Sequence, residues 1–404
     1  MIKKEPISKR IYLDYAATTP VDTEVFNAMK PFFGEGLIFG NPNSLHSFGR
    51  ESLKYIDEAR AKIAQSIGAD FNEIIFTGSA TEANSLALRG VLKNYHHQSN
   101  KITSRPKIII SAIEHESVYE TAKDLEKEGV ETVIIPVNKN GIIDVKKIEK
   151  ELDERTILIS IMYANNEIGT IQPIFEISKI IENWKSKTGN YETTHPLFHT
   201  DAVQAFQFLD CNVKKLGVDL MTFSAHKIYG PKGVGVLYVK KNKTYPLSSI
   251  ITGGGQEFGL RSGTQNIAGI VGCAKACELA DKNRNKETKR IAKLREELWT
   301  SIKKVYPKAE TNGSLENTLP NILNVYFPDI SSELFLIKLD MEGIAVSSGS
   351  ACHARSQEPS RIIQDIWGET RARESIRFSL GKYTTKEEIE YVGGVLKRVL
   401  ENIK

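Results

Sequence analysis

The fold is decided by a stretch in the middle of the chain, residues 196–239, which reads PLFHTDAVQAFQFLDCNVKKLGVDLMTFSAHKIYGPKGVGVLYV. It contains three short apolar runs, Pro196–Thr200, Leu220–Phe223 and Val234–Val239, separated by polar and turn-forming residues. Runs that are apolar on both faces are typical of strands covered by helices on each side of a sheet. The stretch therefore predicts three buried strands with polar side chains at their ends.

The same pattern extends toward the N-terminus. Four further strand-like runs precede the stretch: Glu73–Thr77, Lys107–Ser111, Thr132–Val137 and Thr156–Met162. Helical stretches such as Glu116–Glu128 and Asp144–Leu152 lie between the runs. This alternation predicts a large α/β domain over residues 17–280, with a mostly parallel seven-stranded sheet between helices.

Beyond residue 280 the pattern changes. A charged helical stretch, Lys282–Lys304, is followed by strand-like runs at Asn321–Phe327, Ile344–Ser347 and Ser375–Ser379. The last segment opens with a capping box at Thr385 and Glu388 and continues with apolar residues at helical spacing. We interpret residues 281–404 as a smaller α+β domain, against which residues 1–16 pack.

The composition is that of an ordinary globular protein. Of 404 residues, 40% are hydrophobic and 26% charged, which excludes a mostly disordered chain, a collagen and a coiled coil. The net charge of +4 argues against direct binding of nucleic acid or an anionic membrane. No apolar run approaches the length of a membrane span, and no leader peptide is predicted. A cytoplasmic protein is expected.

The four cysteines are Cys211, Cys273, Cys277 and Cys352. No CxxC pair is present, so neither a zinc site nor a disulfide framework is predicted, and no metal is expected. Cys273 and Cys277 share one helix face and are predicted to be small core residues. Cys352 differs because it lies in the small and polar run Ser347–Cys352, before a loop-like segment. The sequence leaves open whether this thiol is buried or exposed and reactive.

Polar residues follow four of the predicted strands, where ligands bind in open α/β sheets. They are Glu114 and His115, Asn165 to Glu167, Asp201 with Gln204, and Ser224 to Lys227. Lys227 precedes a Gly/Pro turn and could form a Schiff base with an aldehyde cofactor, although most lysines lie on the surface. Asp201 could keep a pyridinium nitrogen protonated. Phe76–Glu82 is an anion cradle or an ordinary helix N-cap.

These residues together make the chain resemble the NifS/IscS-type cysteine desulfurases, which are fold-type I pyridoxal-phosphate enzymes of the class V aminotransferase group. The matching segments run in family order over nearly the whole chain: Tyr12–Pro20, Phe39–Ser44, Phe76–Glu82, Glu114–His115, Asn165–Gly169, His199–Gln204, Ser224–Gly233, Gly253–Gly255 with Arg261–Thr264, Ser347–Cys352 and Ser375–Gly381. One departure is the order Gly78-Ser79, where the family usually has Ser-Gly. This swap leaves the local backbone in question.

The resemblance implies a role for each matching residue. Lys227 would bind pyridoxal phosphate covalently, Asp201 would pair with the ring nitrogen, Gln204 with the ring oxygen, and His115 would stack on the ring and move protons. Ala80, Thr81, Ser224 and His226 would bind the phosphate, with Thr264 supplied by the other subunit of a homodimer. Asn41, Asn166 and Arg377 would bind the substrate. Cys352 would accept the sulfur as a persulfide.

The implied activity is removal of sulfur from L-cysteine, which leaves L-alanine. A sulfur-acceptor protein would then collect the persulfide sulfur for iron–sulfur cluster assembly, tRNA thiolation or another thiolation of nucleic acid. A selenocysteine lyase or another class V aminotransferase or lyase would keep Lys227 and Asp201, as would a non-enzymatic scaffold. A plain aminotransferase would not need a cysteine in an exposed loop at position 352, so Cys352 favours sulfur chemistry.

Overall fold

The computed structural model describes residues 10–403, apart from 35–37, 99–104, 189–194 and 350–358. Its largest element is a seven-stranded sheet with the strand order β2-β8-β7-β6-β5-β3-β4. The strands are β2 (Ile74–Thr77), β3 (Lys107–Ser111), β4 (Glu131–Ile135), β5 (Thr156–Ser160), β6 (Leu197–Asp201), β7 (Leu220–Ser224) and β8 (Gly235–Val239). β8 runs antiparallel to both of its neighbours, β2 and β7, and the other pairings in this sheet are parallel. The predicted mostly parallel sheet is confirmed.

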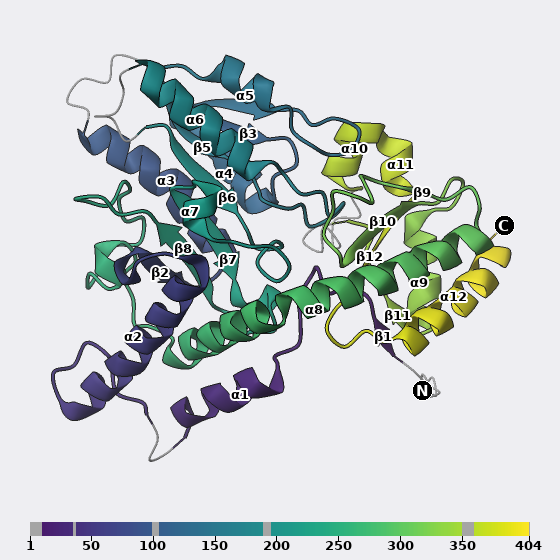
Figure 1. Cartoon of the computed structure of the whole chain (residues 1–404), viewed down its shortest axis with the longest axis horizontal. Coiled ribbons are helices and arrows are strands. Elements are labelled where there is room, and N and C mark those ends of the chain that lie inside the picture. The colour runs from purple at the N-terminus through teal and green to yellow at the C-terminus, as the bar shows by residue number, and fades with distance from the viewer. Residues whose placement is uncertain (1–9, 35–37, 99–104, 189–194, 350–358, 404) are drawn as a thin grey trace.

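Helices cover both faces of this sheet (Figure 1). They include α2 (Ser47–Ile67), α3 (Ala80–Gln98), α4 (Glu116–Glu126), α5 (Val145–Glu151), α6 (Ile174–Thr188) and α7 (Val213–Leu216). In β3, Ile109 packs in the cluster that contains α2 and α6 residues, whereas Ile108 and Ile110 pack with α3 and α4 residues. Because neighbouring strand residues point to opposite faces, runs apolar at every position fill both interfaces.

The longest helix, α8 (Ile267–Val305), extends over 39 residues and runs alongside both parts of the molecule (Figure 1). Its first half packs on the large sheet layer and buries Cys273 and Cys277, as predicted. In its second half, Ile291, Leu298 and Ile302 pack in a second hydrophobic core, that of the smaller part of the molecule. The predicted helix over Lys282–Lys304 is therefore too short. The change in composition at residue 280 reflects a change in what the helix packs against, not the start of a new helix. The domain boundary predicted there falls inside α8.

The smaller part contains the antiparallel sheet β12-β10-β9, the two-stranded pair β1-β11 and several helices. Their bounds are β1 (Ile11–Tyr12), β9 (Glu310–Thr311), β10 (Ile322–Tyr326), β11 (Ile344–Ala345), β12 (Ser375–Ser379), α9 (Ser332–Met341), α10 (Arg361–Trp367), α11 (Glu369–Arg373) and α12 (Lys386–Glu401). The capping box of Thr385 and Glu388 opens α12, as predicted. Ile11 and Leu13 lie in the same core as α12. None of the described helices is long and apolar enough to cross a membrane.

Candidate active site

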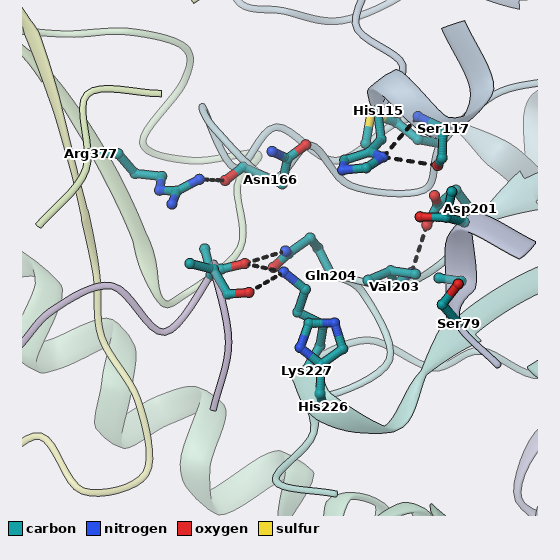
Figure 2. A pocket seen from close by; sticks show the side chains of 15 residues that line it. Ser79, His115, Ser117, Asn166, Asp201, Val203, Gln204, His226, Lys227 and Arg377 are labelled. Atoms are coloured by element: carbon teal, nitrogen blue, oxygen red, sulfur yellow. Dashed lines mark hydrogen bonds between the residues drawn. The ribbon is translucent and has the colours of Figure 1, made fainter. Parts of the chain in front are cut away.

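A pocket opens at the carboxyl-end rim of the large sheet, where the parallel strands β3, β5, β6 and β7 end. Nine of the predicted site residues line it: Ala80, Thr81, His115, Asn166, Asp201, Gln204, His226, Lys227 and Arg377. Figure 2 shows their side chains converging from both parts of the molecule. The strand ends and the N-terminus of α3 supply most of them, and β12 supplies Arg377. The predicted rim thus brings together residues from separate strands.

Lys227 lies at the end of the short 3-10 helix η3 (Ala225–Lys227), which follows β7 directly. Its Nζ donates to the carbonyl oxygens of Ala16 at 2.5 Å and Ala17 at 2.8 Å (Figure 2). Gln204 Nε2 donates to the same Ala16 carbonyl at 2.9 Å. The N-terminal segment thus forms one wall of the pocket and holds the amine inside it.

His226, the neighbour of Lys227, contacts Thr18 across 3.1 Å between its Nδ1 and the Thr18 hydroxyl. Burial lowers the pKa of His226 to about 4, and the charges of Lys227 and Lys232 act in the same direction. This imidazole is therefore neutral near pH 7. It is suited to hydrogen bonding with an anion as a neutral donor.

Asp201 stands at the end of β6 and is held by two donors. Asn84 Nδ2 donates to Asp201 Oδ2 at 2.8 Å, and the Val203 backbone N–H donates to Oδ1 at 2.9 Å. Asn84 is fully buried in α3 and also donates to the Ser117 hydroxyl. A carboxylate fixed in this way can face a protonated ring nitrogen without rotating.

The segment before α3 forms a tight helix N-terminus. Ser79 Oγ accepts from the Glu82 backbone N–H at 3.1 Å, and Gly78 N donates to Glu82 Oε2 at 2.8 Å. Gly78 is not among the residues with positive φ, so the swapped Gly-Ser order needs no left-handed backbone here. Gly235 of β8 lies directly behind the turn: a Cβ there would approach the Ser79 carbonyl carbon to 2.3 Å. Ser79, Ala80 and Thr81 line the pocket, so the N-terminus of α3 borders it and can bind an anion there.

His115 is the N-cap of α4, and its Nδ1 accepts from the Ser117 N–H at 3.1 Å. The preceding residue, Glu114, is fully buried, and its Oε1 accepts from Ser111 Oγ and from the Met162 N–H. Burial raises the pKa of Glu114 to about 8, because the hydrogen bonds to its charged form only partly offset desolvation. The Glu114 carboxyl group, whose hydrogen bonds hold the turn that leads to His115, is therefore mostly protonated at neutral pH.

Arg377 and Asn166 lie together on the side of the pocket opposite Asp201 (Figure 2). Arg377 is 1% exposed, and it donates to the Asn166 carbonyl at 2.9 Å and to Asp14 Oδ1 at 2.7 Å. Arg377 Nε and Asn166 Oδ1 are buried without a hydrogen-bond partner among the described residues. Unpaired buried polar atoms are costly, so they mark a place where a polar ligand fits.

Four predicted site residues are not in the pocket lining. The buried Ser224 donates its hydroxyl to the Val234 carbonyl at 3.3 Å, because β7 and β8 pair side by side there. Asn41 is exposed and turns its side chain to the Asn43 N–H, and Thr264 is also exposed. Cys352 lies outside the described residues. Within the described chain, Ser224 and Asn41 therefore do not contribute to the pocket.

The pocket also contains residues that sequence reasoning did not assign. They are Ala16, Ala17, Ser79, Ser117, Met162 and Val203, and Asn84 lies directly behind them. Ala16 and Ala17 act through their backbone carbonyls, which side-chain chemistry cannot reveal. Asn84 lies in the second turn of α3 and Ser117 in the first turn of α4, at the same rim as the predicted residues. The signal in the sequence that could have identified Asn84 and Ser117 is their position shortly after strand-like runs.

A family model for Aminotransferase class-V matches residues 11–392. The chain belongs to the class V aminotransferase family. It is 46% identical over 401 residues to the cysteine desulfurase IscS of Dictyoglomus turgidum, with 98% of this chain and 96% of that protein covered. Within the family it is therefore a cysteine desulfurase of the NifS/IscS type.

Solved structures agree with this family assignment. A NifS-like protein superposes with a TM-score of 0.87 at 38% identity, covering 97% of this chain and all of that one. A structure described as SspA in complex with cysteine superposes with a TM-score of 0.77 at 34% identity, covering 93% of this chain and 100% of that chain. The resemblance predicted from the motifs, and the fold that it implies, are confirmed.

Proposed function

We propose that this cysteine desulfurase uses pyridoxal phosphate to remove sulfur from L-cysteine, and that Cys352 receives the sulfur as a persulfide. The observation that carries the proposal is the pocket itself. It holds a lysine amine, a fixed carboxylate and a helix N-terminus on one side. On the other side is a buried arginine with one nitrogen that has no hydrogen-bond partner among the described residues. The solved relative described in complex with cysteine supports the choice of substrate.

The residues of the pocket fit pyridoxal phosphate. Lys227 would provide the amine for its aldehyde, Asp201 would face its ring nitrogen, and the turn of Ser79, Ala80 and Thr81 would bind its phosphate. The backbone of Gly235 packs so closely against Ser79 and Ala80 that only glycine fits at position 235 without a shift of this turn. When bound, the cofactor supplies an electron sink for the α-carbon of the substrate.

The substrate's carboxylate would lie between Arg377 and Asn166. Arg377 Nε has no partner within the described structure, and the guanidinium is already oriented by Asp14 and the Asn166 carbonyl. A carboxylate there would satisfy this donor with a charge-assisted hydrogen bond. Lys227 would accept the α-proton of the substrate, and His115 would move protons on the cofactor side of the pocket.

The sulfur step needs a thiolate. Cys352, which lies outside the described residues, would attack the substrate sulfur, forming one S–S bond as the substrate Cβ–S bond breaks. The electron pair of the broken bond stays on the carbon skeleton, which is protonated and leaves as alanine. Cysteine and one enzyme thiol thus give alanine and one enzyme persulfide, and no external oxidant is required. A second protein thiol would then collect the outer sulfur.

The test is an assay for alanine and sulfide from L-cysteine in the presence of a thiol reductant. We expect Lys227→Ala to lose both products, and Cys352→Ala to keep bound cofactor but lose sulfide release. Cys211→Ala is the matched control, because that cysteine is buried away from the pocket. A wild type that forms no alanine, or a Cys352→Ala variant that releases sulfide at the wild-type rate, would contradict the proposal.

A homodimer is part of the proposed function. Phe39, Leu45 and Phe48 are 64%, 91% and 55% exposed, and the rings of Phe39 and Phe48 lie 5.6 Å apart. We call these three residues the Phe39 patch. Exposed apolar side chains gathered in this way are typical of protein interfaces. Thr264 is exposed on its own chain and would reach the phosphate of the partner subunit.

The destination of the sulfur is proposed only as a class. The acceptor would be a protein with an accessible thiol that serves iron–sulfur cluster assembly or nucleic-acid thiolation, without direct binding of nucleic acid by this chain. The cytoplasmic location stays a prediction.

A further inference from the structure

Arg361 is the first residue of α10 and belongs to the smaller part of the molecule, yet its side chain reaches the large sheet. Its Nη1 donates to the Ala112 carbonyl at 2.7 Å, and its Nη2 donates to the Glu114 carbonyl at 2.8 Å. Both carbonyls lie in the short turn between β3 and α4. That turn leads directly to His115.

Two further contacts fix the plane of the guanidinium. Arg361 Nε donates to Glu116 Oε1 at 3.3 Å, and the guanidinium carbon lies 3.8 Å from the centre of the Tyr119 ring. The side chain of Arg361 is only 22% exposed. The planar guanidinium stacks on a ring through its face and donates hydrogen bonds through its edge, a combination that a lysine ammonium group does not reproduce.

The backbone start of α10 is held separately. Ser360 Oγ accepts from the Ile363 N–H at 3.1 Å and donates to Glu167 Oε2, which is buried beneath the pocket. The N-terminus of α10, from which the Arg361 side chain extends, is therefore held in place by Ser360. Apart from an ion pair with Asp365 on α10 itself, the contacts of Arg361 fall on the turn and first helical residues around His115.

The His115 turn is thus held from two sides. On the sheet side, the Glu114 carboxyl accepts from Ser111 and from the Met162 N–H. On the other side, Arg361 binds the carbonyls on each side of Ile113. Without Arg361, the turn would lose its hydrogen bonds from α10, while the Glu114 contacts and the hydrogen bond from Asn165 to the Ile113 carbonyl would remain. Ile113 would also keep its packing against Ile362 and Ile363.

We propose that Arg361 is a positioning residue for the reaction: it holds the backbone of the Ala112–Glu114 turn so that the His115 ring keeps its place in the pocket. The inference rests on the proposed function for the role of His115. Arg361 does not line the pocket itself, and its hydrogen bonds go to Ala112, Glu114 and Glu116 and not to the Asn166–Arg377 pair. Loss of Arg361 should therefore affect turnover and leave the binding of cysteine nearly unchanged.

The test compares Arg361→Ala and Arg361→Lys with Arg373→Ala, which removes an exposed arginine paired with Glu369 on α11. We expect Arg361→Ala to lower kcat for alanine formation by up to about 100-fold, the cost of a small misplacement of a reacting group. KM for cysteine should stay within about twofold of the wild-type value, because uniform binding is not removed. Arg361→Lys should recover only part of kcat, and Arg373→Ala should behave as the wild type.

Two readouts do not depend on turnover. Amide hydrogen exchange of a peptide spanning residues 112–119 should be faster in Arg361→Ala than in the wild type or Arg373→Ala. The visible absorbance maximum of the bound cofactor should shift in Arg361→Ala only. Equal thermal unfolding midpoints and cofactor contents would show that the variants are folded.

The outcomes separate the two claims. A wild type without alanine formation contradicts the proposed function, while hydrogen exchange still decides whether Arg361 holds the turn. Unchanged exchange and an unchanged kcat in Arg361→Ala would overturn the inference. So would an equal loss of kcat in Arg361→Ala and Arg373→Ala, or a loss that Arg361→Lys restores completely.

Discussion

Asn84 and Asp201 are joined by a hydrogen bond of 2.8 Å between Asn84 Nδ2 and Asp201 Oδ2, although 117 residues separate them along the chain. The bond connects the second turn of α3, just after the residues that would bind the phosphate, with the end of β6, where the cofactor ring nitrogen would lie. One buried amide thus sets the distance between the two ends of the cofactor site.

Substitution of Asn84 should weaken cofactor binding. Asn84→Leu keeps the approximate volume but leaves Asp201 Oδ2 without its buried donor, a change worth about 1.5–3 kcal/mol for a charged group. We expect the Kd for pyridoxal phosphate to rise by roughly tenfold to a hundredfold. The measurement is an absorbance titration of the cofactor-free protein. Ser85→Ala, which alters the next residue of the same helix, should bind as the wild type, and equal affinities for all three proteins would contradict the prediction.

Glu114 should make stability depend on pH. Its pKa is raised from 4.5 to about 8 by burial, so the folded state keeps a proton that the unfolded state has released between these values. The wild type therefore loses stability as pH rises through this window. The Glu114→Gln variant lacks this loss. As pH rises through the window, its free energy of unfolding should therefore increase relative to that of the wild type by up to about 1.4 kcal/mol per pH unit. Urea unfolding at pH values from about 5 to about 9 measures the difference.

The control for this experiment is Glu120→Gln, because Glu120 is an exposed residue of α4, the helix that follows Glu114. Its stability should follow that of the wild type at every pH. A constant difference between Glu114→Gln and the wild type across the range would show that Glu114 does not titrate there.

The buried ion pair of Arg60 and Glu257 should be important for stability. Arg60 Nη1 and Nη2 donate to the two carboxylate oxygens at 2.8 Å and 2.9 Å, and both residues are less than 5% exposed. Glu257→Ala would leave the arginine charge buried and unpaired, which costs about 3–5 kcal/mol. Glu342→Ala breaks the exposed pair with Arg398 and should cost less than about 1 kcal/mol. Chemical denaturation of both variants is the measurement, and similar losses would refute the distinction.

The Phe39 patch should hold the proposed dimer together. The double variant Leu45→Asp and Phe48→Asp would place two charges in an apolar interface, where their desolvation is costly. We expect sedimentation analysis to give a dimer for the wild type and a monomer for the variant, with weaker cofactor binding in the monomer. Met341→Asp is the control, since Met341 is 75% exposed on α9. A monomeric wild type at micromolar concentration would exclude the dimer proposal.

Several site residues were predictable because their signals are local. Lys227, Asp201 and His115 each follow a strand-like run, and in a parallel sheet such strand ends share one rim. Their arrival in one pocket follows from that rule. Asn41 was predicted from the family pattern alone and Ser224 also from its place at a strand end, and neither lines the pocket within the described chain. A motif specifies residue types in order, but side-chain direction depends on the neighbours that the fold supplies.

The sequence by itself determined the seven strands, the helices between them and the set of polar residues at the strand ends. Apolar periodicity and turn residues are local properties, and burial enforces them wherever the segment lies in the core. Only the tertiary structure decided that Lys227 meets the Ala16 and Ala17 carbonyls, that Arg377 pairs with Asp14, and that Arg361 holds the His115 turn. These contacts depend on strand order and on how the two parts of the molecule pack, which no local pattern encodes.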